Sequence, residues 1–235
     1  DKIVHEEAKG LIQKTSYFPF FSLKLLGYDL FFLFRHPDRY LSAFFTATIG
    51  NLRSLNFFLK TCALWYKAIG FAWLARKQKI THVHGEWATY PATVAFIISK
   101  LNNIPFSFTG HAHDIYLDTT MLSYKLRVAK FIVTCTENNK RHLLELAPRS
   151  QRPKVPSEKI VVSYHGVDLE KFKREVPTSQ GSNVPSKFKI LSVGSLLECK
   201  GFEYLIEACR ILKEKGMDFE CTIAGGGPLE QNLKS

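Results

Sequence analysis

Apolar residues along this chain alternate between short strand-like runs and longer helix-like stretches. Over residues 51–77 they recur at spacings of three and four, which predicts one helix. Its expected buried face consists of Leu52, Leu55, Leu59, Cys62, Tyr66, Ile69 and Trp73. Further on, the pattern predicts helices over 90–101 and 136–147, the latter capped by Thr136, and strands over 80–84, 104–109, 130–134 and 160–163. This alternation is typical of βαβ units around a parallel sheet and predicts the α/β class.

The composition changes after residue 174, where a stretch rich in serine and proline has no apolar periodicity. We expect a first domain over 1–174, a linker over 175–187 and a second domain over 188–235. In the second domain, strands over 188–193 and 219–224 should flank a helix over 201–215, ended by Gly216. Its expected inward residues are Phe202, Leu205, Ile206, Cys209 and Leu212. Because about fifty residues are too few for such a domain, we expect it to be incomplete and both ends of a longer chain to be absent.

The most apolar segment, residues 18–34, leaves two interpretations open. Lys24, Gly27 and Asp29 interrupt it, and it is shorter than the roughly 20 residues that a bilayer span needs. It is either a helix packed on its own domain or an amphipathic helix in a membrane interface. In the second case, phospholipid headgroups would lie beside Arg35, His36 and Arg39.

Composition and charge narrow the classes of partner. A net charge of +11 indicates a surface that prefers anions, such as nucleotide phosphates, an anionic membrane leaflet or nucleic acid. Nucleic acid is the weakest of the three, because the basic residues are dispersed and no RNP-like or zinc-finger pattern occurs. Five scattered cysteines without a Cys-x-x-Cys pair predict neither a disulfide framework nor a zinc site, and fit a reducing cytoplasm.

Candidate chemistry follows the strand that ends at Gly110. Two histidines, His111 and His113, and then Asp114 come directly after this glycine. Ligands of α/β proteins bind outside the carboxyl ends of the strands, and an imidazole there can exchange protons near neutral pH. An isolated histidine more often serves a buried carbonyl group, but two of them around a strand-ending glycine favour a functional site.

Two glycine-bearing strand ends in the second domain suit a diphosphate. Gly194 and Lys200 follow one strand, and Gly225, Gly226 and Gly227 follow the other. Such loops let backbone amides approach a phosphate closely before a helix begins. Neither matches the Rossmann or P-loop pattern, and an ordinary turn is the alternative explanation.

Five motifs follow one another along the chain: His82–Glu86, Phe108–Tyr116, His165–Phe172, Val193–Phe202 and Ala224–Leu229. In this order they resemble the family 4 retaining glycosyltransferases, especially the branch that builds bacterial exopolysaccharides such as colanic acid. The resemblance implies the GT-B fold, with two Rossmann-like domains that have parallel sheets and face each other across a cleft. It implies catalytic roles for His111 and Asp114 and acceptor binding by His84, Glu86 and His113. The implied donor-binding residues are Gly166, Gly194, Ser195, Lys200, Gly225, Gly226 and Gly227.

The implied activity is transfer of a hexose from a nucleotide-sugar donor to a lipid-linked or polysaccharide acceptor. The resemblance implies no cofactor and no metal, and no Asp-x-Asp signature occurs. The expected location is the cytoplasm, with peripheral contact at the inner face of the membrane. Ser195 stands where many such enzymes carry an arginine, and with both ends absent we expect this polypeptide alone to be inactive. Two alternatives remain: a non-catalytic sugar-nucleotide-binding or scaffold protein, and a GT-B sugar-nucleotide epimerase.

Overall fold

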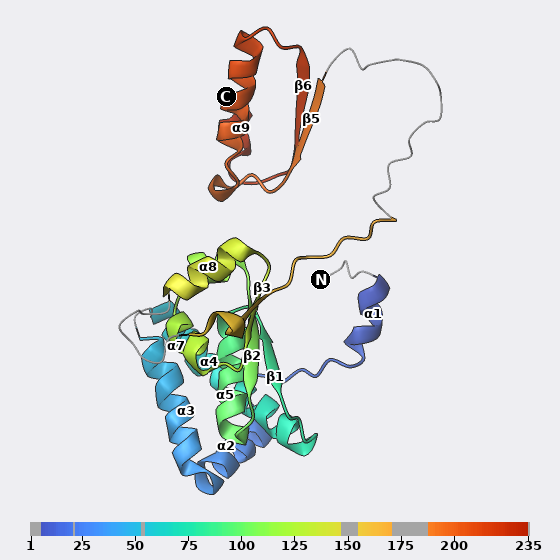
Figure 1. The fold of residues 1–235 in the computed structure, drawn as a ribbon. Coiled ribbons are helices and arrows are strands. Elements are labelled where there is room, and N and C mark those ends of the chain that lie inside the picture. Colours follow the sequence, from blue (N-terminus) through green and yellow to red (C-terminus); the bar gives the residue numbers. More distant parts are fainter. Residues whose placement is uncertain (1–5, 21, 53–54, 147–154, 171–187, 235) are drawn as a thin grey trace. The chain divides into compact units, whose positions relative to one another are not determined.

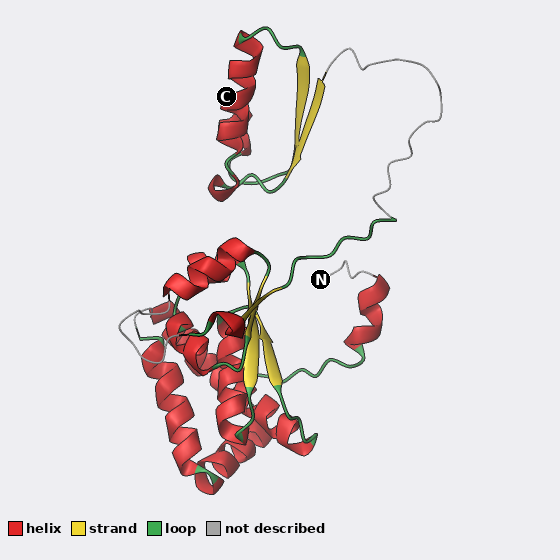
Figure 2. Ribbon diagram, in the orientation of Figure 1, coloured by secondary structure: helices red, strands yellow, loops and turns green. Residues whose placement is uncertain are grey.

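The chain divides into two units, residues 1–168 and 169–235 (Figure 1). The computed structural model describes residues 6–20, 22–52, 55–146, 155–170 and 188–234. The predicted linker over 175–187 therefore lies outside the described residues. Both units combine parallel strands with helices (Figure 2), which confirms the predicted α/β class with parallel sheets.

The sheet of the first unit has four parallel strands in the order β1-β2-β3-β4, and its carboxyl edge carries the candidate chemistry. These strands are β1 (Val83–Glu86), β2 (Phe106–Gly110), β3 (Ile132–Thr134) and β4 (Ile160–Val162). At this edge Glu86 pairs with Thr109, and Thr134 lies between Gly110 and Val162. The ends of all four strands thus meet at one edge, as parallel pairing requires.

The first strand begins later than the predicted range 80–84. Lys79 has a left-handed backbone with φ of 54°, and the Ile80 amide donates to the Ala75 carbonyl oxygen at 2.9 Å. These residues therefore finish the preceding helix, and Ile80 is exposed. β1 therefore runs past the predicted end at His84 and includes Glu86.

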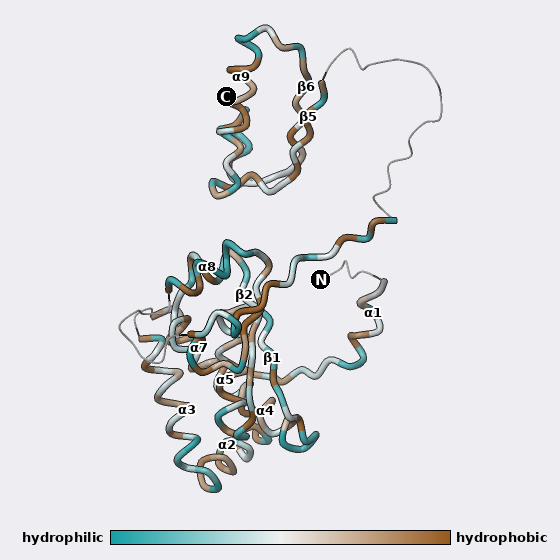
Figure 3. Tube along the Cα trace, in the orientation of Figure 1, coloured by the Kyte–Doolittle hydropathy of each residue, from teal (hydrophilic) through white to brown (hydrophobic). Residues whose placement is uncertain are grey.

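The first unit has eight described helices, and several of them form its core together with the sheet. They are α1 (Glu6–Ile12), α2 (Leu23–Arg35), α3 (Pro37–Gly50), α4 (Leu55–Lys77), α5 (Tyr90–Asn102), α6 (Ala112–Tyr116), α7 (Leu122–Val128) and α8 (Glu137–Leu146). Helix α5 packs on β1 and β2 and also contacts α3 and α4, while α8 contacts β3 and β4. Figure 3 shows apolar residues along α5 and the neighbouring strands. Phe96 and Phe108 are fully buried there. The predicted cap of α8 is confirmed, since the Asn139 amide donates to Thr136 Oγ1 at 3.1 Å.

The predicted buried face of the helix over 51–77 is right at Ile69 and wrong in its first part. Leu52 lies before α4, and Leu52, Leu55 and Leu59 are exposed. Cys62, Tyr66 and Trp73 are partly buried. The buried positions on the described part of α4 are Thr61, Trp65, Ala68, Ile69, Gly70, Ala72 and Ala75. Small side chains let the α4 backbone approach α5 closely, so alanines occupy this contact. Counting only large apolar residues selected a neighbouring face.

Helix α2 packs on its own domain, the first of the two interpretations for residues 18–34. Asp29, which interrupts the apolar run, is buried and joins three helices. Its carboxylate accepts from the Tyr40 hydroxyl of α3 at 3.0 Å and from Trp65 Nε1 of α4 at 3.0 Å. Burial and the adjacent Asp29 charge raise the pKa of Tyr40. Among the described residues no helix is long and apolar enough to cross a membrane.

The second unit pairs β5 (Phe188–Val193) with β6 (Phe219–Ala224) in parallel, and both strands agree with the prediction. Helix α9 (Phe202–Glu214) connects them, and α10 (Glu230–Lys234) follows β6. Phe202, Leu205, Cys209 and Leu212 are at least partly buried as predicted, whereas Ile206 is exposed. Gly216, with φ of 79°, ends the helix as expected.

We predict that Asp29→Ala destabilises the first unit by about 1–3 kcal/mol, because the buried Trp65 N–H and Tyr40 hydroxyl lose their acceptor. Urea unfolding followed by tryptophan fluorescence measures the change. The control is Asp38→Ala, which removes an exposed carboxylate in the first turn of α3. It should lower the free energy of unfolding by less than about 1 kcal/mol, because it alters only a charge near a helix N-terminus. Equal effects of the two substitutions would show that Asp29 does not hold the helices together.

Candidate active site

The candidate site of the first unit lies at the carboxyl ends of β1 and β2. His84 and Glu86 belong to β1, and His111 follows β2 directly and caps the N-terminus of α6. His111 Nε2 lies 2.8 Å from Glu86 Oε1, and His84 Nε2 lies 3.7 Å from Glu86 Oε2. The structure therefore brings together three of the residues that the sequence singled out.

The ring of His111 is enclosed by two other rings. Trp87 lies on one side, with ring centroids 4.6 Å apart, and the His165 ring is parallel to it within 7° at 5.7 Å. The side chain of His111 is 20% exposed, so solvent or a substrate can still reach it. Because a carboxylate oxygen only accepts, Nε2 of His111 carries the proton in this contact.

The environment of Glu86 favours its carboxylate form. Desolvation alone would raise the pKa of Glu86, but hydrogen bonds from His111 and Thr109 and the charge of nearby imidazoles lower it overall. Glu86 is thus an ionised acceptor at neutral pH, able to orient the imidazole of His111.

A row of polar side chains continues along β1 and β2. Ser107 Oγ lies 2.8 Å from His82 Nε2 and 2.7 Å from His84 Nδ1, and His84 Nε2 lies 2.8 Å from Thr109 Oγ1. His82 stacks on Phe131 at 5.5 Å. Both nitrogens of His84 are therefore engaged, and its ring is fixed beside Glu86.

Asp114, predicted as a catalytic residue, is buried beneath the contacts of His111. Its carboxylate is 1% exposed and accepts from the backbone amides of His111, at 2.6 Å, and of Ala88. These contacts join the turn after β1 to the turn after β2. The expected catalytic role of Asp114 stays a prediction.

Lys125, on α7, is a residue that the sequence analysis missed. Its ammonium group is buried and donates to the carbonyl oxygens of Ala88, at 2.7 Å, and Thr89, at 2.9 Å. Burial lowers the pKa of Lys125 to about 7, against the opposing effect of the Asp114 charge. The signal in the sequence is its position between Leu122 and Leu126, on the apolar face of a short helix.

Two other predicted residues of the first unit lie nearby without joining the contacts of His111. His113 is exposed on α6, and its side chain makes no hydrogen bond, ion pair or ring contact among the residues that the structure describes. Gly166 is exposed after β4, with open space around the position of a Cβ atom. Their expected roles in acceptor and donor binding stay predictions.

A cysteine joins the histidines at this edge. Ligand atoms of His111, Cys135 and His165 lie within 4.8 Å of one another. Cys135 follows β3 directly, and His165 comes three residues after β4. Sequence spacing gave no sign of this cluster, because the sheet brings together residues that are 24 and 30 positions apart in the chain.

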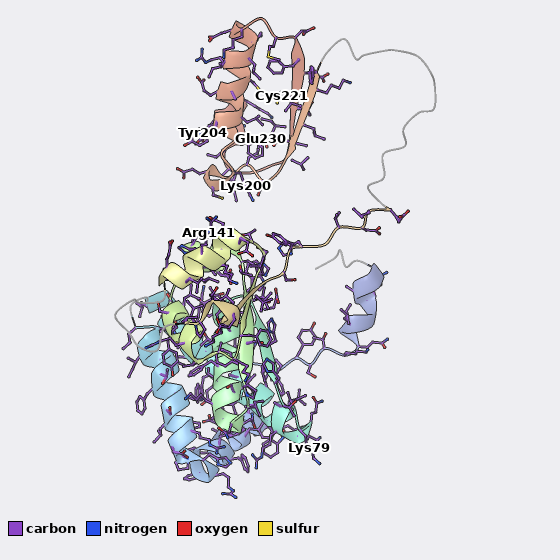
Figure 4. All side chains as sticks on the ribbon, in the orientation of Figure 1. Lys79, Arg141, Lys200, Tyr204, Cys221 and Glu230 are labelled. Atoms are coloured by element: carbon purple, nitrogen blue, oxygen red, sulfur yellow. The ribbon has the colours of Figure 1, made fainter. Side chains whose placement is uncertain are left out.

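In the second unit, the loops after β5 and β6 pack backbone against backbone. The Gly194 amide donates to the Ala224 carbonyl oxygen at 3.0 Å, and the Leu196 amide to that of Gly226 at 3.0 Å. Ser195 and Lys200 are exposed in the first of these loops, just before α9 (Figure 4 labels Lys200). Lys200 and the loop amides thus belong to one small surface at the carboxyl edge of β5.

The glycines of the second loop have different functions in this packing. A Cβ atom on Gly225 would lie 1.8 Å from the Gly194 carbonyl oxygen, and one on Gly227 would lie 2.6 Å from that of Leu196. At Gly226 nothing lies within 4 Å of such an atom. Close approach of the two loops therefore requires Gly225 and Gly227, whereas Gly226 leaves its side open.

Comparison with known proteins confirms the resemblance to glycosyltransferases of exopolysaccharide synthesis. Residues 175–235 match the family model of glycosyl transferases group 1. The amylovoran biosynthesis glycosyltransferase AmsK of Erwinia amylovora is 45% identical over 80 residues, which cover 34% of this chain and 19% of that protein. The colanic acid biosynthesis glycosyltransferase WcaL of Escherichia coli, a provisional name, is 40% identical over 89 residues. These residues cover 38% of this chain and 21% of WcaL. The matched segments thus span about a fifth of the length of these relatives.

We predict that Gly225→Ala destabilises the second unit by about 1–3 kcal/mol, because the added methyl group forces the two loops apart. Gly226→Ala is the matched control and should change stability by less than about 0.5 kcal/mol. Thermal unfolding followed by circular dichroism compares them. If both variants unfold at the same temperature as the original chain, Gly225 is not needed for close packing of the loops.

Proposed function

We propose that the protein is a retaining glycosyltransferase that moves a hexose from a nucleotide-sugar donor to a lipid-linked or polysaccharide acceptor of exopolysaccharide synthesis. The observation that carries the proposal is the contact between His111 and Glu86 at the carboxyl edge of the first sheet. The match of residues 175–235 to group 1 glycosyl transferases supports it independently.

His111 is proposed to orient and polarise the reacting sugar hydroxyl groups. Its imidazole is partly exposed, and Glu86 fixes its proton on Nε2. In that state Nδ1 carries the acceptor lone pair, which lies toward the Asp114 amide at the start of α6. Glu86 and His84 are proposed to bind hydroxyl groups of the acceptor, because both side chains are exposed. His84 would do so by exchanging its contact with Ser107 or Thr109 for a sugar hydroxyl.

The second unit is proposed to stabilise the leaving diphosphate. Breaking the bond between an anomeric carbon and a phosphate places negative charge on the diphosphate, and stabilising that charge lowers the barrier. The exposed Lys200 ammonium supplies positive charge for this purpose, while the amides of Gly194 and Leu196 hold the two loops together. Because a protein cation can stabilise this charge, we propose that transfer needs no metal ion. The leaving phosphate then assists deprotonation of the acceptor on the same face of the sugar, which retains the configuration.

Peripheral membrane contact is proposed through the outer side of α2. One side of α2 is buried, but Leu23, Leu26, Leu30 and Phe34 recur at spacings of three and four and are exposed. An exposed apolar stripe flanked by Lys24 and Arg35 suits an anionic membrane interface, where a lipid-linked acceptor would lie. His36 is less suited to this role than expected, because burial and the neighbouring arginines lower its pKa.

We predict that His111→Ala in the full-length protein lowers turnover far more than donor binding, because the imidazole acts on the reacting groups. Lys200→Ala should instead weaken affinity for the nucleoside diphosphate, with Lys213→Ala on the same unit as the control. Transfer of radiolabelled sugar from candidate nucleotide sugars to a lipid-linked acceptor measures turnover, and calorimetry measures affinity.

Three outcomes would contradict this function. Turnover close to the original level in His111→Ala would remove this residue from the reaction. Unchanged affinity in Lys200→Ala would remove Lys200 from diphosphate binding. Nucleotide-sugar binding without any turnover would identify a scaffold or binding protein.

A further inference from the structure

We propose that His111, Cys135 and His165 form a binding site for a zinc ion at the carboxyl edge of the first sheet. The three residues come from the ends of three neighbouring parallel strands, β2, β3 and β4. Each strand end delivers one nitrogen or sulfur atom to the same place, and these atoms lie within 4.8 Å of one another. The fold therefore assembles the cluster, although the residues are far apart in the sequence.

The chemistry of the three ligands selects the metal. Two imidazole nitrogens and one thiolate sulfur suit a borderline-soft ion such as Zn²⁺, whereas Mg²⁺ and Ca²⁺ prefer oxygen ligands. Three protein ligands leave the fourth tetrahedral position open for water or an exogenous ligand. His165 is exposed and His111 partly exposed, so an ion can enter from solvent.

The cluster can contract to bind the ion. Tetrahedral zinc with Zn–N and Zn–S bonds near 2.0 and 2.3 Å places two nitrogens and one sulfur roughly 3.3–3.6 Å apart. A separation of 4.8 Å must therefore shorten by roughly 1.2–1.5 Å. His165 can supply this movement by side-chain rotation, because it lies in an exposed segment after β4. His111 and Cys135 can stay on their strand ends.

Neighbouring groups already orient two of the ligands. His111 Nε2–H donates to Glu86 Oε1 at 2.8 Å, so Nδ1 is the nitrogen for a metal bond, which would replace its capping contact with the Asp114 amide. A carboxylate behind a histidine is a recurrent arrangement at zinc sites, where it fixes the tautomer and strengthens the ligand. Asn139 Nδ2 donates to Cys135 Sγ at 3.3 Å and directs the sulfur from the start of α8.

A consequence follows that rests on the proposed function. Zinc and the sugar-transfer reaction would compete for the imidazole of His111, so a bound ion should inhibit transfer reversibly. Zinc binding itself needs no transfer activity. Zinc binding can therefore be tested even if the protein transfers no sugar, and sugar transfer can be tested even if the protein binds no zinc.

The test is titration of the tag-free, reduced chain with Zn²⁺ alone by calorimetry and with Co²⁺ by absorption spectroscopy. We expect one ion per chain and a thiolate-to-cobalt charge-transfer band. Cys135→Ser should abolish the band, and both Cys135→Ser and His165→Ala should weaken zinc affinity by at least tenfold. Glu86→Gln should weaken zinc affinity by about tenfold, which is the lower limit of the effect commonly seen when a group that orients a metal ligand is lost.

Matched controls separate this site from general metal binding. Cys62→Ser removes another partly buried thiol of the same unit, and His113→Ala removes an exposed imidazole two residues from His111. Both should keep the stoichiometry and the band. Circular dichroism confirms that each variant is folded. Absence of stoichiometric binding, or binding that is unaffected by Cys135→Ser and His165→Ala, would overturn the proposal.

Discussion

Two buried charged groups on either side of Ala88 hold the geometry of the first unit's site. Asp114 accepts from the amide of Ala88, and Lys125 donates to its carbonyl oxygen at 2.7 Å. Asp114 also accepts from the amide of His111, so one carboxylate joins the turn after β1 to the turn after β2. Removing one of these groups leaves a buried backbone amide or carbonyl oxygen without its partner, which commonly costs about 1–3 kcal/mol. The site therefore depends on this interaction before any substrate is present.

The position of Trp87 shows how this constraint reaches the reactive groups. Trp87 has φ of 83°, an unusual left-handed conformation for a residue other than glycine. It lies between Glu86, which bonds His111, and Ala88, which both charged groups hold. The strained residue brings its ring against His111 at 4.6 Å. In the second unit the corresponding constraint is steric, since Gly225 lets two loops meet at their backbones.

Much of the fold and part of the site could be predicted from the sequence, for identifiable physical reasons. The strands 188–193 and 219–224 and the cap at Thr136 follow from local patterns, and the structure has them. The motif around Gly110 pointed to a strand end because a buried strand stops there. The cluster around Cys135 could not be found this way, because His111 and His165 follow other strands. A lysine on an apolar helix face marks Lys125 as unusual, but its partners Ala88 and Thr89 lie in another segment and do not follow from that pattern. The buried face of α4 was missed in part because alanines carry that contact.

The central claim is that Lys125, together with Asp114, positions His111 against Glu86. Nitrogen-15 NMR of the histidine side chains tests it most directly, because the spectrum shows which ring nitrogen carries the proton. We expect His111 to be protonated at Nε2 in the original chain and in the exposed-site control Lys130→Met, and to lose this single tautomer in folded Lys125→Met. An unchanged His111 spectrum in Lys125→Met would contradict the account.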